Sequence, residues 1–210
     1  MFFLAYFMIL LYLCTQNKRN MLSVKTFYCN PFRECTYILT AAEPSEKPQP
    51  CLIIDPGMFE AKEENRVLTF LREHYLTPAA ILITHAHPDH ICGLEAVLKA
   101  YPDTPKYGYN DLHEDESTPI TLAGMTFRML NTPGHKEDAV CFYFEEDGIL
   151  FSGDTLFQES VGRTDLPGGD MPTLQASLQR LTLLPDTTVV YPGHGYTTTI
   201  AHEKRYNPYL

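Results

Sequence analysis

Apolar runs alternate with short turn-forming segments along most of the chain, and their spacing predicts where strands and helices lie. Strands are expected at 22–28, 35–41, 51–55, 80–84, 105–109, 119–122, 124–131, 138–145, 148–152 and 187–191. Helical spacing is found at 60–75, from Leu94 through Leu98, at 173–183 and near 199–205. Strand-rich halves that each carry helices predict an α+β fold, with two β-sheets packed face to face and helices on the outer faces.

The first 20 residues differ from the rest of the chain. Met1–Cys14 is almost wholly apolar, but a spanning helix needs roughly 20 apolar residues. Positive charge at Lys18 and Arg19 follows the run, whereas a secretory signal carries it in front. Residues 1–20 are therefore interpreted as an apolar extension upstream of a true start at Met21, with a weak membrane anchor as the alternative. One catalytic domain is expected over 21–210. A cytoplasmic location is expected, or a membrane-associated or exported one if residues 1–20 are a targeting segment.

Composition narrows the class of partner. The 210-residue chain has 44% hydrophobic residues, which suffices for one substantial core, and a formal net charge of -10. A long phosphate backbone would meet net repulsion, and the tightest basic pairs, Lys18-Arg19 and Lys204-Arg205, are too short for a nucleic-acid footprint. A small-molecule substrate is expected. The six cysteines form no C-x-x-C pair and are interpreted as buried thiols: Cys14, Cys29, Cys35, Cys51, Cys92 and Cys141.

The strongest chemical signal is the segment from Thr84 to His90, Thr-His-Ala-His-Pro-Asp-His, which we place in the loop after an apolar strand. Side chains alternate in direction along an extended segment, so His85 and His87 point to the same side. Asp89 and His90 can then turn toward a neighbouring point about 3.5–4 Å away, the usual spacing of a two-metal site. One stretch of chain can therefore serve two ions.

Further candidate ligands each follow a predicted strand and a glycine: His135, Asp154 and His194. Tight Pro-Gly or Gly turns project side chains from strand ends, and imidazole with carboxylate is a common donor set for zinc. Five of the eight histidines fall in such positions, which argues against coincidence. Ordinary surface or structural roles are expected for the others, His74, His113 and His202.

These residues, His-x-His-x-Asp-His at 85–90 followed by His135, Asp154 and His194, resemble the metallo-β-lactamase superfamily over essentially all of 21–210. The resemblance implies an αββα sandwich of two mixed sheets. It also implies a first metal held by His85, His87 and His135, a second held by Asp89, His90 and His194, and a bridging Asp154. Two divalent ions are expected, zinc first, with iron or manganese possible because the donors accept all three.

Within the superfamily, the commonest β-lactamases place Cys where this chain has Asp154 and lack the histidine matched by His90. Segments 151–170, 191–195 and 207–210 instead look like short glyoxalase II-like hydrolases. That resemblance implies hydrolysis of S-acylglutathione-type thioesters by a metal-bridging hydroxide, with Asp89 and Asp154 as catalytic residues and Asp89 able to hold the proton. The sequence ends soon after His194, so we expect it to lack the C-terminal helical domain of full-length glyoxalase II and to have a more open site.

Two other functions remain open. A persulfide dioxygenase on the same fold would use a single iron held by His85, His135 and Asp154. A non-catalytic module would keep metal only to stabilise its loops, although structural zinc sites are closed by protein ligands and this set leaves a position for water. Arg163 and Asp165 are expected to form a salt bridge that ties their loop to the sheet. Four tyrosines could line the site: Tyr107, Tyr109, Tyr196 and Tyr206.

Overall fold

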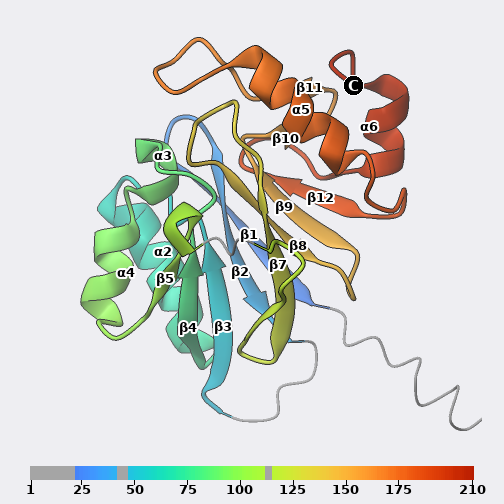
Figure 1. Ribbon diagram of the computed structural model, residues 1–210. Helices are drawn as coiled ribbons and strands as arrows, with labels where there is room; N and C mark the ends of the chain where they lie inside the picture. The colour runs from blue at the N-terminus through green and yellow to red at the C-terminus, as the bar shows by residue number, and fades with distance from the viewer. Residues whose placement is uncertain (1–21, 42–46, 112–114) are drawn as a thin grey trace, which may run out of the picture.

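The computed structural model describes residues 22–41, 47–111 and 115–210, so the expectation for residues 1–20 lies outside the described chain. Two sheets face each other (Figure 1). The first has the order β1 (Ser23–Cys29), β2 (Glu34–Thr40), β3 (Gln49–Ile54), β4 (Leu76–Leu82), β5 (Lys106–Tyr107). The second has the order β13 (Thr198–Thr199), β12 (Val189–Pro192), β9 (Ile149–Gly153), β8 (Val140–Phe144), β7 (Met125–Asn131), β6 (Ile120–Leu122).

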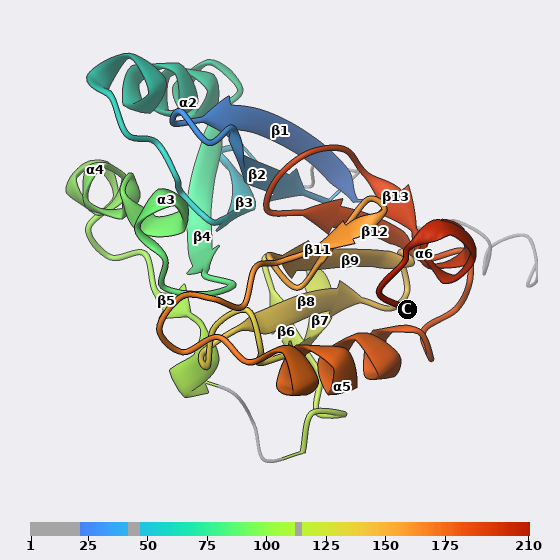
Figure 2. The same ribbon diagram turned by 90° about the horizontal axis from the view of Figure 1, so that it is seen from above.

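Both sheets are mixed, as the family resemblance implies. In the first, β3, β4 and β5 run parallel while β1 and β2 are antiparallel; in the second, β9 and β12 are the parallel pair. Helices cover the outer faces (Figure 2): α2 (Ala61–Glu73), α3 (Pro88–Ile91) and α4 (Leu94–Ala100) beside the first sheet, α5 (Met171–Leu181) and α6 (Ile200–Tyr206) beside the second. The predicted αββα architecture is confirmed.

Alternate residues of the strands serve two different cores. On β3, Leu52 and Ile54 pack between the sheets against aromatic residues such as Phe142 of the second sheet. Cys51 and Ile53 pack on the opposite face, under the helices. A strand buried on both faces is apolar at every position, which is why β3 reads as a continuous apolar run.

Several boundaries differ from the sequence prediction. Strand β4 begins at Leu76 and ends at Leu82, because its first residues pair in parallel with the start of β3 despite Pro78. Pro88 starts the one-turn helix α3, so Asp89 and His90 are helical rather than in a loop. Three short strands were not predicted: β10 (Leu156–Phe157), β11 (Ser160–Val161) and β13. Between β8 and β9 the chain turns at Gly148, which has φ +65°.

The cysteines largely match their expected role. Within the described residues all are free thiols; Cys29, Cys35, Cys51 and Cys141 are buried, whereas Cys92 is partly exposed, contrary to prediction. Cys14 lies outside the described residues. None of the helices in the described ranges is both long and apolar enough to cross a membrane.

Candidate metal centre

The candidate ligands gather at one end of the sandwich, where the β4, β9 and β12 strands end. His85 and His87 follow β4, and Asp89 and His90 stand on α3. Three more come from the second sheet, one after each of β7, β9 and β12: His135, Asp154 and His194. Parallel strands place their carboxyl ends at the same edge of a sheet, so side chains far apart in sequence meet there. The structure brings all seven predicted residues together.

His85, His87 and His135 form the first group, with ligand atoms that all lie within 4.8 Å of one another. His87 Nδ1 lies 3.0 Å from His85 Nε2 and 2.9 Å from His135 Nε2. Nitrogens bound to one tetrahedral zinc, each about 2.0–2.1 Å from it, are separated by roughly 3.3 Å. The three rings therefore point at one another at a separation that suits a single small cation.

The second group consists of Asp89, His90 and His194. His194 Nε2 lies 3.4 Å from Asp89 Oδ2, and His90 Nε2 lies 4.0 Å from the same oxygen. This group is less tightly closed than the first, and Asp89 and His194 are each 23% exposed. It therefore faces the solvent side of the centre.

Asp154 lies between the two groups. Its Oδ1 is 3.3 Å from His90 Nε2, and its Oδ2 is 3.5 Å from His135 Nε2 and 3.6 Å from His194 Nε2. Oδ2 thus lies between a histidine of the first group and one of the second, and a carboxylate in contact with both groups is the arrangement that a metal-bridging ligand requires.

Two buried atoms at this centre test whether a cation fits. His90 Nε2 and Asp154 Oδ1 are buried, and neither has a hydrogen-bond partner in the described part of the chain. Buried polar atoms are almost always satisfied, so a pair aimed into the same space indicates a missing ligand. Imidazole nitrogens and carboxylate oxygens suit zinc, iron and manganese alike. The residues present therefore fit a divalent metal.

Protonation of the centre follows from burial and charge. Burial lowers the pKa of His85 well below its ordinary value, which keeps the ring neutral as a metal ligand must be. Burial acts the same way on His90, but the carboxylates of Asp154 and Asp55 outweigh it and raise the pKa of His90 to about 10. Burial alone would raise the pKa of Asp154, yet His90 holds it well below its usual range. Without a metal, His90 carries the positive charge that balances Asp154.

Asp55 is a residue of the centre that the sequence analysis missed. It follows β3 with φ +46°, and its Oδ2 accepts a hydrogen bond from His90 Nδ1 at 3.0 Å. Thr84 donates to the same carboxylate from its backbone nitrogen at 2.8 Å and from Oγ1 at 2.6 Å. A carboxylate behind a metal-binding histidine fixes its tautomer and leaves Nε2 free. A partial signal was available, because Asp55 stands at a strand end beside Pro56 and Gly57, but it precedes the glycine, whereas the predicted ligands follow one.

Glu34, also missed, lies beside Asp55 at the start of β2. It is fully buried, and Thr36 Oγ1 donates to its Oε2 at 2.9 Å. Burial, with a smaller contribution from the Asp55 charge, raises the pKa of Glu34 well above its ordinary value. Burial therefore favours the neutral carboxylic acid form of Glu34.

Backbone carbonyls orient two further histidines. His135 Nδ1 lies 2.7 Å from the carbonyl oxygen of Arg163, and His194 Nδ1 lies 3.0 Å from that of Phe32. Both contacts require a hydrogen on Nδ1, which again leaves Nε2 for a metal. The predicted Arg163–Asp165 salt bridge is present, with both contacts at 2.7 Å. It stays exposed within its own loop, and the carbonyl of Arg163, rather than the ion pair, ties that loop to the centre.

Other predicted residues lie at or beyond the edge of the centre. Tyr107 and Tyr109 line a hollow of about 360 Å³ beside His85, while Tyr196 and Tyr206 are exposed. His74 lies with Nδ1 2.9 Å from the carbonyl oxygen of Phe70, and His202 pairs with Glu159. Their expected structural roles agree with these contacts. His113 lies outside the described residues.

Comparison with known proteins places this geometry in a family. The model of the metallo-beta-lactamase superfamily matches residues 46–120 and 115–194. A probable metallo-hydrolase of Bacillus subtilis, YqgX, is 34% identical over 192 residues, covering 76% of this chain and 87% of the relative. A hydroxyacylglutathione hydrolase of Francisella tularensis subsp. novicida is 37% identical over 152 residues, covering 69% of this chain but only 58% of the relative.

Solved structures agree with the sequence relatives. The BLEG-1 B3 metallo-beta-lactamase superposes with a TM-score of 0.80 at 32% identity, covering 90% of this chain and 99% of its own. TTHA1623, in a di-iron-bound form, superposes with a TM-score of 0.73 at 35% identity, covering 89% of this chain and 100% of its own. ETHE1 from Myxococcus xanthus superposes with a TM-score of 0.75 at 29% identity, covering 89% of this chain and 83% of its own. The chain therefore belongs to the metallo-β-lactamase superfamily, whose members bind divalent metals, and is a metallohydrolase of that family.

Proposed function

We propose that the protein is a two-metal thioesterase that cleaves S-acylglutathione-type thioesters. The observation that carries this proposal is the position of Asp154, with buried oxygens that face both ligand groups and an Oδ1 that has no hydrogen-bond partner among the described residues. The Francisella relative supports the substrate class through its name, hydroxyacylglutathione hydrolase. In the proposed assignment, His85, His87 and His135 hold one ion, Asp89, His90 and His194 hold the other, and Asp154 bridges them.

Two divalent ions, most simply zinc, would supply an activated water at neutral pH and polarise the thioester carbonyl. The chain's own residues prepare the site for that chemistry. Asp89 stands on the open side, and although burial would raise its pKa, a hydrogen bond from His194 lowers it, so the carboxylate is ionised and can accept a proton. A thiolate departs with little protonation, so the residues need supply no strong general acid.

Metal content and hydrolysis, measured on one preparation, test this proposal. Protein purified without added metal should contain two divalent ions per chain and should hydrolyse S-lactoylglutathione or another glutathione thioester. His87→Ala should abolish both properties, whereas His202→Ala, a histidine variant outside the centre, should retain them. Because BLEG-1 is a B3 metallo-beta-lactamase, a β-lactam belongs in the substrate panel. Hydrolysis of the lactam without hydrolysis of any thioester would contradict the proposal.

A one-iron persulfide dioxygenase is the second candidate, and the di-iron-bound form of TTHA1623 supports iron as a metal for this fold. His85, His135 and Asp154 would hold the single ion. One iron per chain together with oxygen uptake on glutathione persulfide would favour this candidate over the thioesterase. Metal without any turnover in either assay would favour a metal-stabilised binding module.

A further inference from the structure

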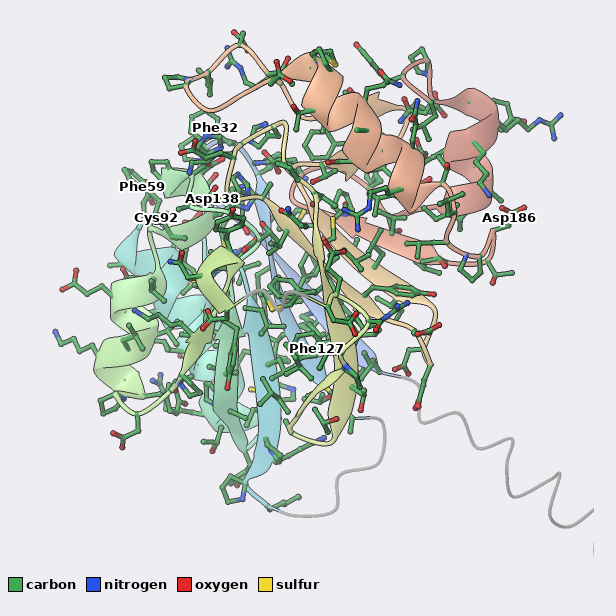
Figure 3. The ribbon with its side chains drawn as sticks, in the orientation of Figure 1. Phe32, Phe59, Cys92, Phe127, Asp138 and Asp186 are labelled. Carbon is green, nitrogen blue, oxygen red and sulfur yellow. The ribbon has the colours of Figure 1, made fainter. Side chains whose placement is uncertain are left out.

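A small apolar hollow of about 170 Å³ lies beside the second ligand group. Its walls come from three segments: Phe32 in the β1–β2 turn, Phe59 in the loop before α2, and Pro88 with Cys92 at the two ends of α3. Figure 3 shows Phe32, Phe59 and Cys92 gathered at one edge of the molecule. The phenylalanine rings are 71% and 65% exposed, an uncovered aromatic surface that indicates a ligand.

Hydrogen bonds hold the three segments in place. Asn30 Nδ2 donates to the carbonyl oxygens of Gly57 and Asp89, both at 2.9 Å. The Glu63 carboxylate accepts from the backbone nitrogens of Asn30 at 2.9 Å and Phe59 at 2.8 Å. The walls are thus fixed before any ligand arrives, which lowers the entropic cost of binding.

The same bonds explain why the hollow is apolar. The Asn30 amide is used between the segments, and Cys92 Sγ donates to the carbonyl oxygen of Gly57 at 3.0 Å. Carbon atoms of the rings, the proline and the cysteine are left toward the hollow. The larger hollow beside His85 is lined by apolar residues such as Ile83 and Leu94 but also by the charged side chains of Lys106, Asp111 and Asp138, which a hydrocarbon filling the hollow would deprive of water.

The apolar hollow adjoins the candidate metal centre through Asp89. Asp89 belongs to both, and its carboxylate faces His194. The carbonyl oxygen of Phe32 holds the Nδ1 side of the same histidine. A thioester held at the second ligand group would therefore lie beside the hollow, and of its two substituents the acyl group is the apolar one that such walls can accept.

We infer that this hollow is the acyl subsite, and that the substrate carries a short, unsubstituted hydrocarbon acyl group rather than a hydroxyacyl group. This inference rests on the proposed thioesterase function and adds the substrate class. A cavity of about 150 Å³ accepts benzene, so the hollow suits a phenyl ring or a chain of about four to six carbons. A hydroxyl group on the acyl chain would find no polar partner on these walls and would lose its hydration.

Thioesters of one thiol that differ only in the acyl group test the inference. With glutathione thioesters of acetate, propanoate, butanoate, hexanoate and lactate, kcat/KM should rise about threefold to fivefold per added methylene as apolar area is buried. The lactoyl thioester should be cleaved more slowly than the butanoyl one. Phe59→Ala should lower the hexanoyl value about tenfold and the acetyl value less than threefold, and Phe59→Leu should restore most of the loss. Leu183→Ala, exposed and remote, is the control.

Each other outcome has a defined meaning. A flat dependence on chain length, or one that Phe59→Ala does not change, would overturn the acyl subsite while leaving the thioesterase function intact. Loss of a dimer in Phe32→Ala and Phe59→Ala without any change in chain-length preference would show that a second copy covers the hollow, and would overturn the inference too. Failure to hydrolyse any thioester would remove the proposed function and the subsite together.

Discussion

Residues 85–90 supply four candidate ligands from one stretch of chain, whereas His135, Asp154 and His194 each come from a separate strand end of the second sheet. We call residues 85–90 the first side of the centre and the other three residues its second side. Different contacts hold the two sides in place. On the first side, the Asp55 carboxylate binds both Thr84 and His90. On the second side, glycines let the backbone come close: a Cβ on Gly193 would overlap Asp154 Oδ1, and one on Gly162 would overlap the backbone of Asp154.

This difference follows from how each side is built. A continuous segment that turns sharply needs side-chain acceptors behind it, because its own backbone cannot satisfy every polar group in a single helical turn. Ligands on separate strands already have a rigid base, and what they need is close approach, which only glycine permits. Metal binding and activity should therefore be sensitive to loss of a hydrogen bond on the first side. On the second side they should be sensitive to substitutions that add volume at a glycine.

The largest effect is expected from Asp154→Ala, which removes the one residue that contacts both ligand groups. His90, His135 and His194 would lose their common partner. We expect kcat/KM to fall at least about a thousandfold and metal content to fall to one ion per chain or fewer. Kinetics and elemental analysis on the same sample measure both. Retention of two tightly bound ions would refute the bridging assignment.

Gly193→Ala tests the second side by volume alone. The new methyl group would overlap Asp154 Oδ1 and crowd His90 Cε1, and displacing a reacting group by about 1 Å costs on the order of 100-fold in rate. Gly148→Ala is a matched control, because Gly148 has φ +65° and no neighbour within 4 Å of an added Cβ. The control should lose about 1 kcal/mol of stability and keep its activity. Equal activity in the two variants would contradict the close-approach argument.

Asp55→Asn tests the first side. The amide would present a donor to His90 Nδ1 or to Thr84, where the structure needs acceptors. Loss of such a carboxylate behind a ligand lowers metal affinity about 10- to 100-fold, and an unsatisfied buried group costs about 1–3 kcal/mol.

Asp186→Asn is the matched control, since Asp186 forms a surface ion pair with Lys204 at 2.6 Å, far from the centre (Figure 3). It should change stability by less than about 1 kcal/mol. Chelator competition and thermal unfolding compare the two variants, and an Asp55→Asn variant that binds metal as tightly as the parent would remove Asp55 from the centre.

The pH dependence of metal binding tests the first side through His90. In the metal-free protein the pKa of His90 is raised to about 10, so the ring is protonated at neutral pH and must release that proton to become a ligand. Metal affinity should therefore rise with pH, about tenfold per unit between pH 6 and 8 for one proton displaced. Zinc titrations with a competing chelator, corrected for the chelator's own protonation, measure the slope. A flat profile would show that His90 is already neutral.

The comparison also shows what the sequence could and could not predict. Asp154 and His194 were predictable because each follows a buried strand and a glycine, a local pattern. The hydrogen bonds of Asp55 to the centre could not be predicted in this way. Its partners Thr84 and His90 lie 29 and 35 residues away and meet it only through the pairing of β3 with β4. The β4 boundaries were wrong because Pro78 reads as a strand breaker, although parallel pairing with β3 continues through it.

The shortest strands were not predicted from the sequence for a related reason. Strands β10 and β11 have two residues each, too few for any alternation to register, and their hairpin leads into the loop whose Arg163 carbonyl orients His135. The apolar hollow likewise joins three segments that only the fold brings together, with Asn30 bonded to residues 27 and 59 positions away. Local patterns thus pointed to the candidate ligands, and long-range contacts determined what surrounds them.

Glu34→Gln should have the smallest effect on catalysis, because glutamine has nearly the same shape and burial favours the neutral form of Glu34. Activity should change less than about threefold, and Thr36 Oγ1 keeps an acceptor. The informative measurement is the free energy of unfolding of the parent and the variant as a function of pH. A raised folded-state pKa means that the native protein retains a proton that the unfolded chain releases above its ordinary value of 4.5, so the parent should lose stability relative to Glu34→Gln as pH rises from there. Denaturant unfolding of both proteins at pH 5 and pH 8 measures the difference. If the variant were instead equally destabilised at both pH values, Glu34 would have to be ionised beside Asp55, and the first side would hold its ligands with two buried charges rather than one.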